Sequence, residues 1–427
     1  MASEVNERGV IRRIALRTLP LILLSYFVAV VDRSNISFAA ATMNADLGFS
    51  ETIYGIGASA FFLGYSLLEV PSNLLLARFG ARVWLARIML TWGVISILTA
   101  FIHTHWQFYA MRFALGVAEA GFYPGVILYI SSWFPGEHRA WAISRFYIAL
   151  PLSFIVMGSL AAPLLAMDGF GGLHGWQWLL VAEGIPSVLL ALVLIAALPD
   201  RPETARWLNA EERTWLQAAL AAENAVIGDA PHSLWRALTS PFVLMLGLAN
   251  ACNYVAINAI VFSAPKLLAH DAGLDVAGVG RIVSAGGVVI ALGLLLVDKA
   301  AGQTVARTLT TYTGLLGLAA MGLALLWLGG TGGTSIAGYI VFIASAQIAG
   351  MLPLAAVSRL IPAADRAGGL AMTNTISQGG AFLGPILWGV LADRTGSYHL
   401  GVALMIPMAL GAACIGLLVR RRSLRIA

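Results

Sequence analysis

Four charged side chains in the first half of the chain lie inside apolar stretches. Asp32 and Arg33 are adjacent in one stretch, residues 16–41, and Arg112 and Glu119 are seven residues apart in another. A charge at the centre of a membrane-spanning helix costs roughly 2.5 to 3.5 kcal/mol, so such residues usually face a bundle interior or a watery cavity. In that setting they carry ions, protons or substrate, and the pattern therefore predicts transport.

The chemistry of the four charges can be worked out from their types. A spacing of seven places Arg112 and Glu119 on one helical face, roughly 10 Å apart along the axis. Arginine offers a planar fork of donors that matches a carboxylate, whereas a carboxylate against an apolar wall can take up and release a proton. Because the four formal charges sum to zero, protonation of either acid would free an arginine for an anion. The alternative for each pair is a fixed structural ion pair.

Other polar side chains inside apolar stretches could complete a site. Tyr65 lies about one turn before Glu69, where its hydroxyl could bond a substrate or its ring could simply pack. The second half holds no acid deep in an apolar stretch, but it does hold amides and a tyrosine: Asn250, Asn253, Tyr254, Asn258, Gln347, Asn374 and Gln378. Of these we choose Asn253 and Tyr254 as substrate contacts, with helix-to-helix hydrogen bonding as the alternative for each of the seven.

The elements that must position these residues are membrane helices. The chain of 427 residues is 59% hydrophobic and 11% charged, with a mean hydropathy of +0.83. Apolar runs of about 20 residues each predict a transmembrane helix. Twelve are expected, near 17–41, 52–77, 83–102, 107–133, 140–166, 177–198, 242–268, 278–297, 307–329, 335–358, 368–391 and 399–419. The predicted fold class is an all-α membrane protein of two six-helix bundles.

Arginines gather in alternate loops between these runs, which by the positive-inside rule predicts that both termini are cytoplasmic. The net charge of +5 is therefore assigned to orientation and not to nucleic-acid binding. The polar stretch 199–240, with a short amphipathic helix expected at 210–222, divides the chain. The predicted domains are an N-terminal bundle (1–198), a cytoplasmic linker (199–240) and a C-terminal bundle (241–427). Similar loops, Pro135-Gly136-Glu137-His138-Arg139-Ala140 and Pro362-Ala363-Ala364-Asp365-Arg366-Ala367, indicate a parallel repeat.

Four motifs resemble those of a known superfamily and of one of its families. Arg78-Phe79-Gly80-Ala81-Arg82 resembles the loop motif of the major facilitator superfamily, with Ala77 where an acid is usual. Residues 32–35 (DRSN), 69–73 (EVPSN) and 116–125 (GVAEAGFYPG) resemble the anion:cation symporter family, in its bacterial branch for tartrate, phthalate, hydroxyphenylacetate and sugar acids.

The resemblance implies roles for individual residues. Asp32 and Glu119 would carry protons, and Arg33 would hold the substrate carboxylate. Arg112 would modulate Glu119 and belong to the substrate-binding site, and Asn374 would contact substrate. Pro151 stands where some relatives have a glutamine, so their specificity is not transferred. The expected function is proton-coupled symport of a small hydroxy-, sugar- or aromatic carboxylate by alternating access.

Several alternatives and absences complete the prediction. An efflux antiporter or facilitator of the same fold is the main alternative, and a membrane enzyme or non-transporting receptor is the next. No nucleophile, P-loop or metalloprotease motif predicts catalysis, and no metal site or cofactor is expected, with H+ as the driving ion. The expected partners are the organic anion and membrane lipid, with no nucleic acid. We expect a monomer in the bacterial inner membrane.

Overall fold

The computed structural model describes residues 6–227, 239–302, 304–329, 332–362 and 365–426. Every regular element in these ranges is helical, and twelve helices are long and apolar enough to cross a membrane. The twelve spans predicted from hydropathy are therefore confirmed.

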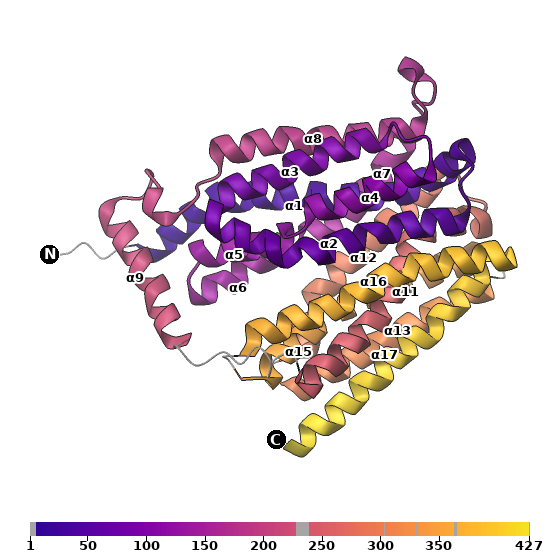
Figure 1. The fold of residues 1–427 in the computed structure, drawn as a ribbon. Coiled ribbons are helices and arrows are strands. Elements are labelled where there is room, and N and C mark those ends of the chain that lie inside the picture. The colour runs from indigo at the N-terminus through magenta and orange to yellow at the C-terminus, as the bar shows by residue number, and fades with distance from the viewer. Residues whose placement is uncertain (1–5, 228–238, 303, 330–331, 363–364, 427) are drawn as a thin grey trace.

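The first six spans occupy the indigo-to-magenta part of the chain (Figure 1). They are α1 (Glu7–Leu47), α2 (Glu51–Phe79), α3 (Ala81–Thr99), α4 (His105–Glu119) with α5 (Phe122–Trp133), α6 (Gly136–Phe146) with α7 (Ala149–Leu165), and α8 (Gly175–Ala197). A short 3-10 helix at Phe170–Gly172 lies between α7 and α8, another at Pro202–Thr204 follows α8, and α9 covers Ala210–Ile227.

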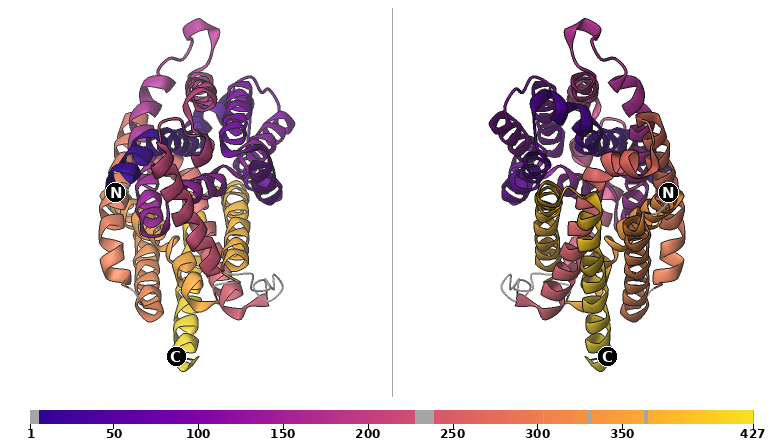
Figure 2. Two further views of the ribbon diagram at one scale, coloured as in Figure 1. Left: turned by 90° about the vertical axis from the view of Figure 1, so that its left-hand side faces the viewer. Right: turned by 90° about the vertical axis from the view of Figure 1, so that its right-hand side faces the viewer.

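The last six spans form the second half. They are α11 (Pro241–Ala272), α12 (Val276–Ala301), α13 (Val305–Leu328), α14 (Gly332–Ala349) with α15 (Leu352–Leu360), α16 (Arg366–Thr395) and α17 (Tyr398–Ile426). The two halves occupy separate regions and meet along a seam (Figure 2).

Three helices that the sequence predicts as continuous are interrupted. The spans expected at 107–133, 140–166 and 335–358 break between α4 and α5, between α6 and α7, and between α14 and α15. At the first break Gly121 adopts a φ of +82°, and a Cβ there would lie 2.5 Å from the Ser72 hydroxyl on α2. Only glycine fits such a backbone next to such a neighbour. Span ten, which corresponds to span four in a six-plus-six repeat, also breaks, but there Met351 keeps a right-handed backbone.

The seam is formed by α2 against α16, α7 against α12 and α1 against α11. At the second contact the backbones of Gly158 and Gly280 nearly touch, since a Cβ on either glycine would lie about 2 Å from the other's carbonyl oxygen. Close approach at small residues is the usual way in which membrane helices pack.

Polar contacts join the halves at the end of the molecule opposite both termini, which we call the far end. Asp393 of α16 accepts hydrogen bonds from the backbone N–H groups of Glu51 (3.0 Å) and Thr52 (2.7 Å), and so caps α2 from across the seam. Lys266 of α11 forms an ion pair with Glu51 at 2.7 Å. The halves are thus joined at the far end, and their ribbons diverge toward the end that carries the termini (Figure 1).

The start of the segment between the halves packs on the first half. Asp200 accepts a hydrogen bond from the backbone of Arg82 at 3.1 Å, and Trp215 of α9 donates to Glu7 at 3.0 Å. The predicted amphipathic helix at 210–222 is confirmed and extends to Ile227. The domain boundaries at 198 and 241 stay a prediction.

Large apolar side chains cover the outside of the bundle. Leu67, Leu192 and Leu295 are 57%, 58% and 73% exposed, whereas the charged residues Asp32, Arg112 and Glu119 are at most 2% exposed. This inverted distribution of polarity is what a helical bundle in lipid requires.

Candidate functional site

A cavity of about 380 Å³ lies between the two halves. Tyrosine hydroxyls of both halves line it, those of Tyr26, Tyr65, Tyr123, Tyr147 and Tyr254. The second half adds side-chain amides, those of Asn258, Gln347, Asn374 and Gln378. Apolar side chains such as Phe62, Phe154 and Phe262 complete the wall. A cavity of this size and polarity suits a small organic molecule.

Arg33 is the only charged residue among the described residues that line this cavity. Its side chain is 29% exposed, and its guanidinium forms an ion pair with Glu119. The guanidinium carbon lies 5.2 Å from the ring centroid of Phe61 and 5.7 Å from that of Tyr65, so two aromatic faces fix its position. One part of the fork is bonded to the protein, and the exposed part remains for an anion in the cavity.

Glu119 is positioned by the break in the fourth span. It is the last residue of α4, and the left-handed Gly121 begins the turn into α5. Its side chain is 2% exposed, and its second oxygen has no hydrogen-bond partner among the described residues. Discontinuous helices commonly form the substrate and ion sites of transporters. Glu119 therefore lies behind Arg33, shielded from the cavity by the residue it binds.

The side chain of Asp32 points in a different direction from that of its neighbour Arg33, because successive residues of a helix are rotated by about 100°. It is 1% exposed and accepts hydrogen bonds from Trp92 and Ser96 of α3 and from Asn35, the last at 3.3 Å. Asp32 thus lies inside the first half and not on the cavity wall. Its role as a proton carrier stays a prediction.

Arg112 is buried away from the cavity. It is 2% exposed, and its Nε and one terminal nitrogen have no hydrogen-bond partner among the described residues. Its guanidinium carbon lies 5.2 Å from the Phe61 ring, as that of Arg33 does. Glu119 therefore pairs with Arg33 in the structure and not with Arg112, the pair considered from spacing alone. Arg112 is not among the described residues that line the cavity, and its predicted contact with substrate stays a prediction.

The predicted residues of the second half divide between cavity and interior. Tyr254 and Asn374 line the cavity, opposite Tyr65 of the first half. Asn374 also donates to the Glu69 carboxylate at 3.2 and 3.4 Å, which makes a polar link across the seam. Asn253 is fully buried and donates to the carbonyl of Ala346 at 3.1 Å, so it forms the helix-to-helix contact that was its alternative.

The sequence-based site omits Glu183, a third buried carboxylate of the first half. It lies on α8, is 4% exposed, and neither of its oxygens has a hydrogen-bond partner among the described residues. Its position inside an apolar run was a visible signal. The site also omits the lining tyrosines Tyr26, Tyr123 and Tyr147, of which Tyr123 lies four residues after Glu119.

The described part of the chain has twelve apolar helices around a central cavity, with charges buried in the bundle and apolar side chains outside. These features define a multi-pass membrane transporter. The chain matches the Major Facilitator Superfamily over residues 22–385. It is 41% identical to an Agrobacterium vitis protein named "Putative tartrate transporter", over 99% of this chain and 96% of the relative. The chain belongs to the Major Facilitator Superfamily, and it is a transporter and not an enzyme.

Two further comparisons extend this result. The chain is 36% identical to a "Quinolone resistance transporter" of Acinetobacter baumannii, over 93% of this chain and 91% of the relative. Its fold is similar to the crystal structure of a bacterial homologue of the human lysosomal transporter Spinster in an inward-facing, unoccupied conformation. That likeness has a TM-score of 0.74 at 16% identity and covers 99% of each chain. The predicted fold class of two six-helix bundles is confirmed.

Proposed function

We propose that this transporter imports a small organic anion, a hydroxy-, sugar- or aromatic carboxylate, together with a proton. The observation that carries the proposal is Arg33, the one charged side chain among the described cavity residues, surrounded by tyrosine hydroxyls and amides. A guanidinium fork binds a carboxylate through two parallel hydrogen bonds, and hydroxyls and amides suit the remaining polar groups of such an acid.

Glu119 supplies the coupling in this proposal. It competes with the substrate for Arg33, because a bound carboxylate and Glu119 both need the same guanidinium. Protonation of Glu119 removes the competing charge and frees Arg33 for the anion. A proton and a monocarboxylate then enter as a neutral pair, which avoids an uncompensated charge in the low-dielectric bundle.

The buried charges support a site for protons. Asp32, Glu119 and Glu183 are three carboxylates, whereas Arg33 and Arg112 are two cations, so the formal sum is −3 + 2 = −1. An unpaired charge in such an interior is costly, and a proton on one of the three acids balances the sum. We propose that Glu183 is neutral throughout the cycle and that Asp32 and Glu119 exchange protons.

The substrate class and the location are also part of the proposal. The relative named for tartrate, at 41% identity over nearly the whole chain, supports a carboxylate substrate. We propose the bacterial inner membrane, with both termini cytoplasmic as the arginine-rich loops predict, and a monomer as the functional unit.

Transport in proteoliposomes tests the function. Purified protein is reconstituted and loaded with one acid from a panel that includes tartrate, phthalate and gluconate, and counterflow of the labelled acid identifies the substrate. Uptake of that acid is then measured with the outside acidic and with no pH gradient. We expect accumulation above the external concentration only with the gradient. Equal initial rates and final levels under both conditions would exclude proton symport.

Two variants separate coupling from translocation. Asp32→Asn and Glu119→Gln should abolish gradient-driven accumulation, because an amide cannot take up and release the proton. Counterflow should survive, and better in Glu119→Gln, since Asp32 holds Trp92 and Ser96 of α3 as well. Glu203→Gln, the same acid-to-amide change at an exposed position between the halves, serves as a control for expression and insertion. If both variants still concentrate substrate, these acids are not the proton carriers.

Efflux by proton antiport is the second candidate. It is favoured by the aromatic lining of the cavity and by the relative named for quinolone resistance, at 36% identity. The same vesicles distinguish it, because an antiporter would lower its substrate inside cells and would accumulate it in vesicles whose lumen is acidic.

A further inference from the structure

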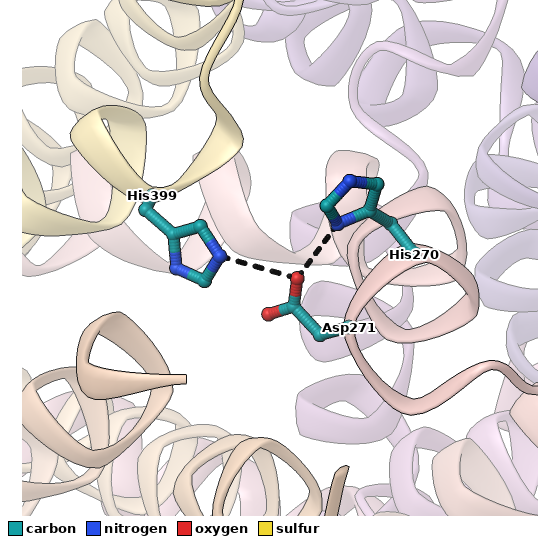
Figure 3. Close-up of side chains that lie close together, drawn as sticks. All are labelled: His270, Asp271 and His399. Carbon is teal, nitrogen blue, oxygen red and sulfur yellow. Dashed lines mark hydrogen bonds and ion pairs between the residues drawn. The ribbon is translucent and has the colours of Figure 1, made fainter. Parts of the chain in front are cut away.

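Two histidines and a carboxylate converge at the far end of the second half (Figure 3). His270 and Asp271 lie in the last turn of α11, and His399 lies in the first turn of α17. Asp271 Oδ1 is 2.9 Å from His270 Nδ1 and 3.3 Å from His399 Nε2. One oxygen atom thus faces a nitrogen of each ring, from two helices that are more than 120 residues apart in sequence.

The carboxylate at the centre is buried, although the histidines reach solvent. The side chain of Asp271 is 2% exposed, whereas those of His399 and His270 are 32% and 62% exposed. Among the described residues both ion-pair partners of Asp271 are histidines, and its second oxygen accepts a hydrogen bond from Ser335 at 3.3 Å. A buried carboxylate needs a positive partner, and a neutral imidazole does not provide one.

The hydrogen bonding of His399 is a second reason why Asp271 needs a positive partner. Its Nδ1 lies 3.1 Å from the carbonyl oxygen of Trp327, an atom that only accepts, so Nδ1 carries the proton. In the neutral ring Nε2 then presents a lone pair to Asp271 Oδ1, another acceptor. A cation between the two atoms resolves this contact. A backbone carbonyl that fixes the ring through its other nitrogen is also the usual arrangement of a metal-binding histidine.

The distances match those of a metal centre. Zn²⁺ binds histidine nitrogen and carboxylate oxygen at about 2.0 to 2.2 Å in tetrahedral geometry, which separates neighbouring ligand atoms by about 3.3 to 3.5 Å. The separation of 3.3 Å from Asp271 to His399 already fits, and all three ligand atoms lie within 4.8 Å of one another. The exposed ring of His270 can adjust by a small rotation, and water would complete the coordination.

We propose that His270, Asp271 and His399 form a binding site for a divalent cation of the zinc class on the far face of the second half. Two imidazoles and one carboxylate favour Zn²⁺ over Mg²⁺ or Ca²⁺, which prefer all-oxygen sites. The ion would link the ends of α11 and α17, on the face where Lys266 of α11 joins the first half. The substrate cavity has no part in this site.

Binding of Zn²⁺ to the purified full-length chain tests the proposal. The protein is prepared without a histidine tag, treated with chelator and titrated with Zn²⁺, and bound metal and the unfolding temperature are both measured. We expect one tight equivalent and a rise in unfolding temperature, since an ion that binds only the native state stabilises it. Asp271→Asn, His270→Ala and His399→Ala should each weaken binding at least about tenfold, and Mg²⁺ should not compete.

His174→Ala is the matched control. His174 also lies near two carboxylates, 3.4 Å from Asp46 and 3.5 Å from Asp168, but outside this cluster. Its loss should leave the tight equivalent intact. Should wild type and the three cluster variants bind Zn²⁺ equally, or should Zn²⁺ fail to raise the unfolding temperature of wild type, the cluster is an ion pair between imidazolium and Asp271 and the proposal is wrong.

Discussion

Replacement of Arg33 by lysine examines the substrate anchor most directly. Lysine keeps the positive charge but loses the planar fork, so it cannot bond Glu119 and a ligand carboxylate in the same geometry. The loss of one charge-assisted hydrogen bond costs about 1.5 to 3 kcal/mol, which at about 1.4 kcal/mol per tenfold corresponds to about 10- to 100-fold weaker binding. The aromatic contacts with Phe61 and Tyr65 can be kept by the ammonium group, so the chain should still fold.

The assay is calorimetry on purified protein, which measures the dissociation constant of the acid with the strongest counterflow signal. Arg112→Lys is the matched control, because it makes the same change in a buried arginine that does not line the cavity. We expect Arg112→Lys to stay within about threefold of wild type. If Arg33→Lys also stays within threefold, Arg33 is not the carboxylate anchor. If Arg112→Lys loses as much affinity as Arg33→Lys, the result would support the sequence-based prediction that Arg112 contacts the substrate.

Three further substitutions test the role of Glu183, which the sequence-based site omits, and the contacts at the seam between the halves. Glu183→Gln should leave uptake within about threefold of wild type, because an amide imitates the neutral acid; loss of gradient-driven uptake in a folded variant would make Glu183 a coupling residue instead. Asp393→Ala removes the cap that α16 places on α2, at a cost of about 1 kcal/mol. The far end should then open about fivefold more often, which is measured as the labelling of a cysteine introduced there. Unchanged labelling would contradict this role of Asp393. Gly280→Leu should abolish transport, because its side chain cannot fit against Gly158, whereas Gly314→Leu, which meets open space, should remain active; equal rates in both would show that transport does not need the close contact of Gly158 with Gly280.

The number and order of the spans could be predicted from the sequence because they depend on local quantities. A run of about 20 apolar residues is long enough to cross a bilayer whatever surrounds it. The breaks within three spans could not be predicted in this way. Gly121 looks like an ordinary glycine of an apolar run, and its left-handed backbone makes sense only once Ser72 of α2 is in place beside it.

The sequence also could not predict which side chains of the candidate site pair with each other. Residue types identified Arg33 and Glu119 as members of one site, but spacing favoured Arg112 as the partner of Glu119, since both lie on one helix. The ion pair that forms joins residues 86 positions apart, on α1 and α4, and so depends on how the whole first half folds. Asn253 is a second example. Its amide donates to a carbonyl on a neighbouring helix, but in the sequence it cannot be distinguished from an amide that faces the cavity.

Charge is divided unequally between the two walls of the cavity. Every described lining residue of the second half is uncharged, whereas the first half holds Arg33 and, behind it, the buried acids. In the proposed function, the first half holds Arg33 and the coupling acids, whereas the second half contributes only uncharged contacts to the substrate. Under that proposal, exchange of Asn258, Gln347 or Gln378 changes which acid fits and leaves proton coupling intact. A library of variants confined to these positions would then yield transporters for other substrates that are still driven by protons.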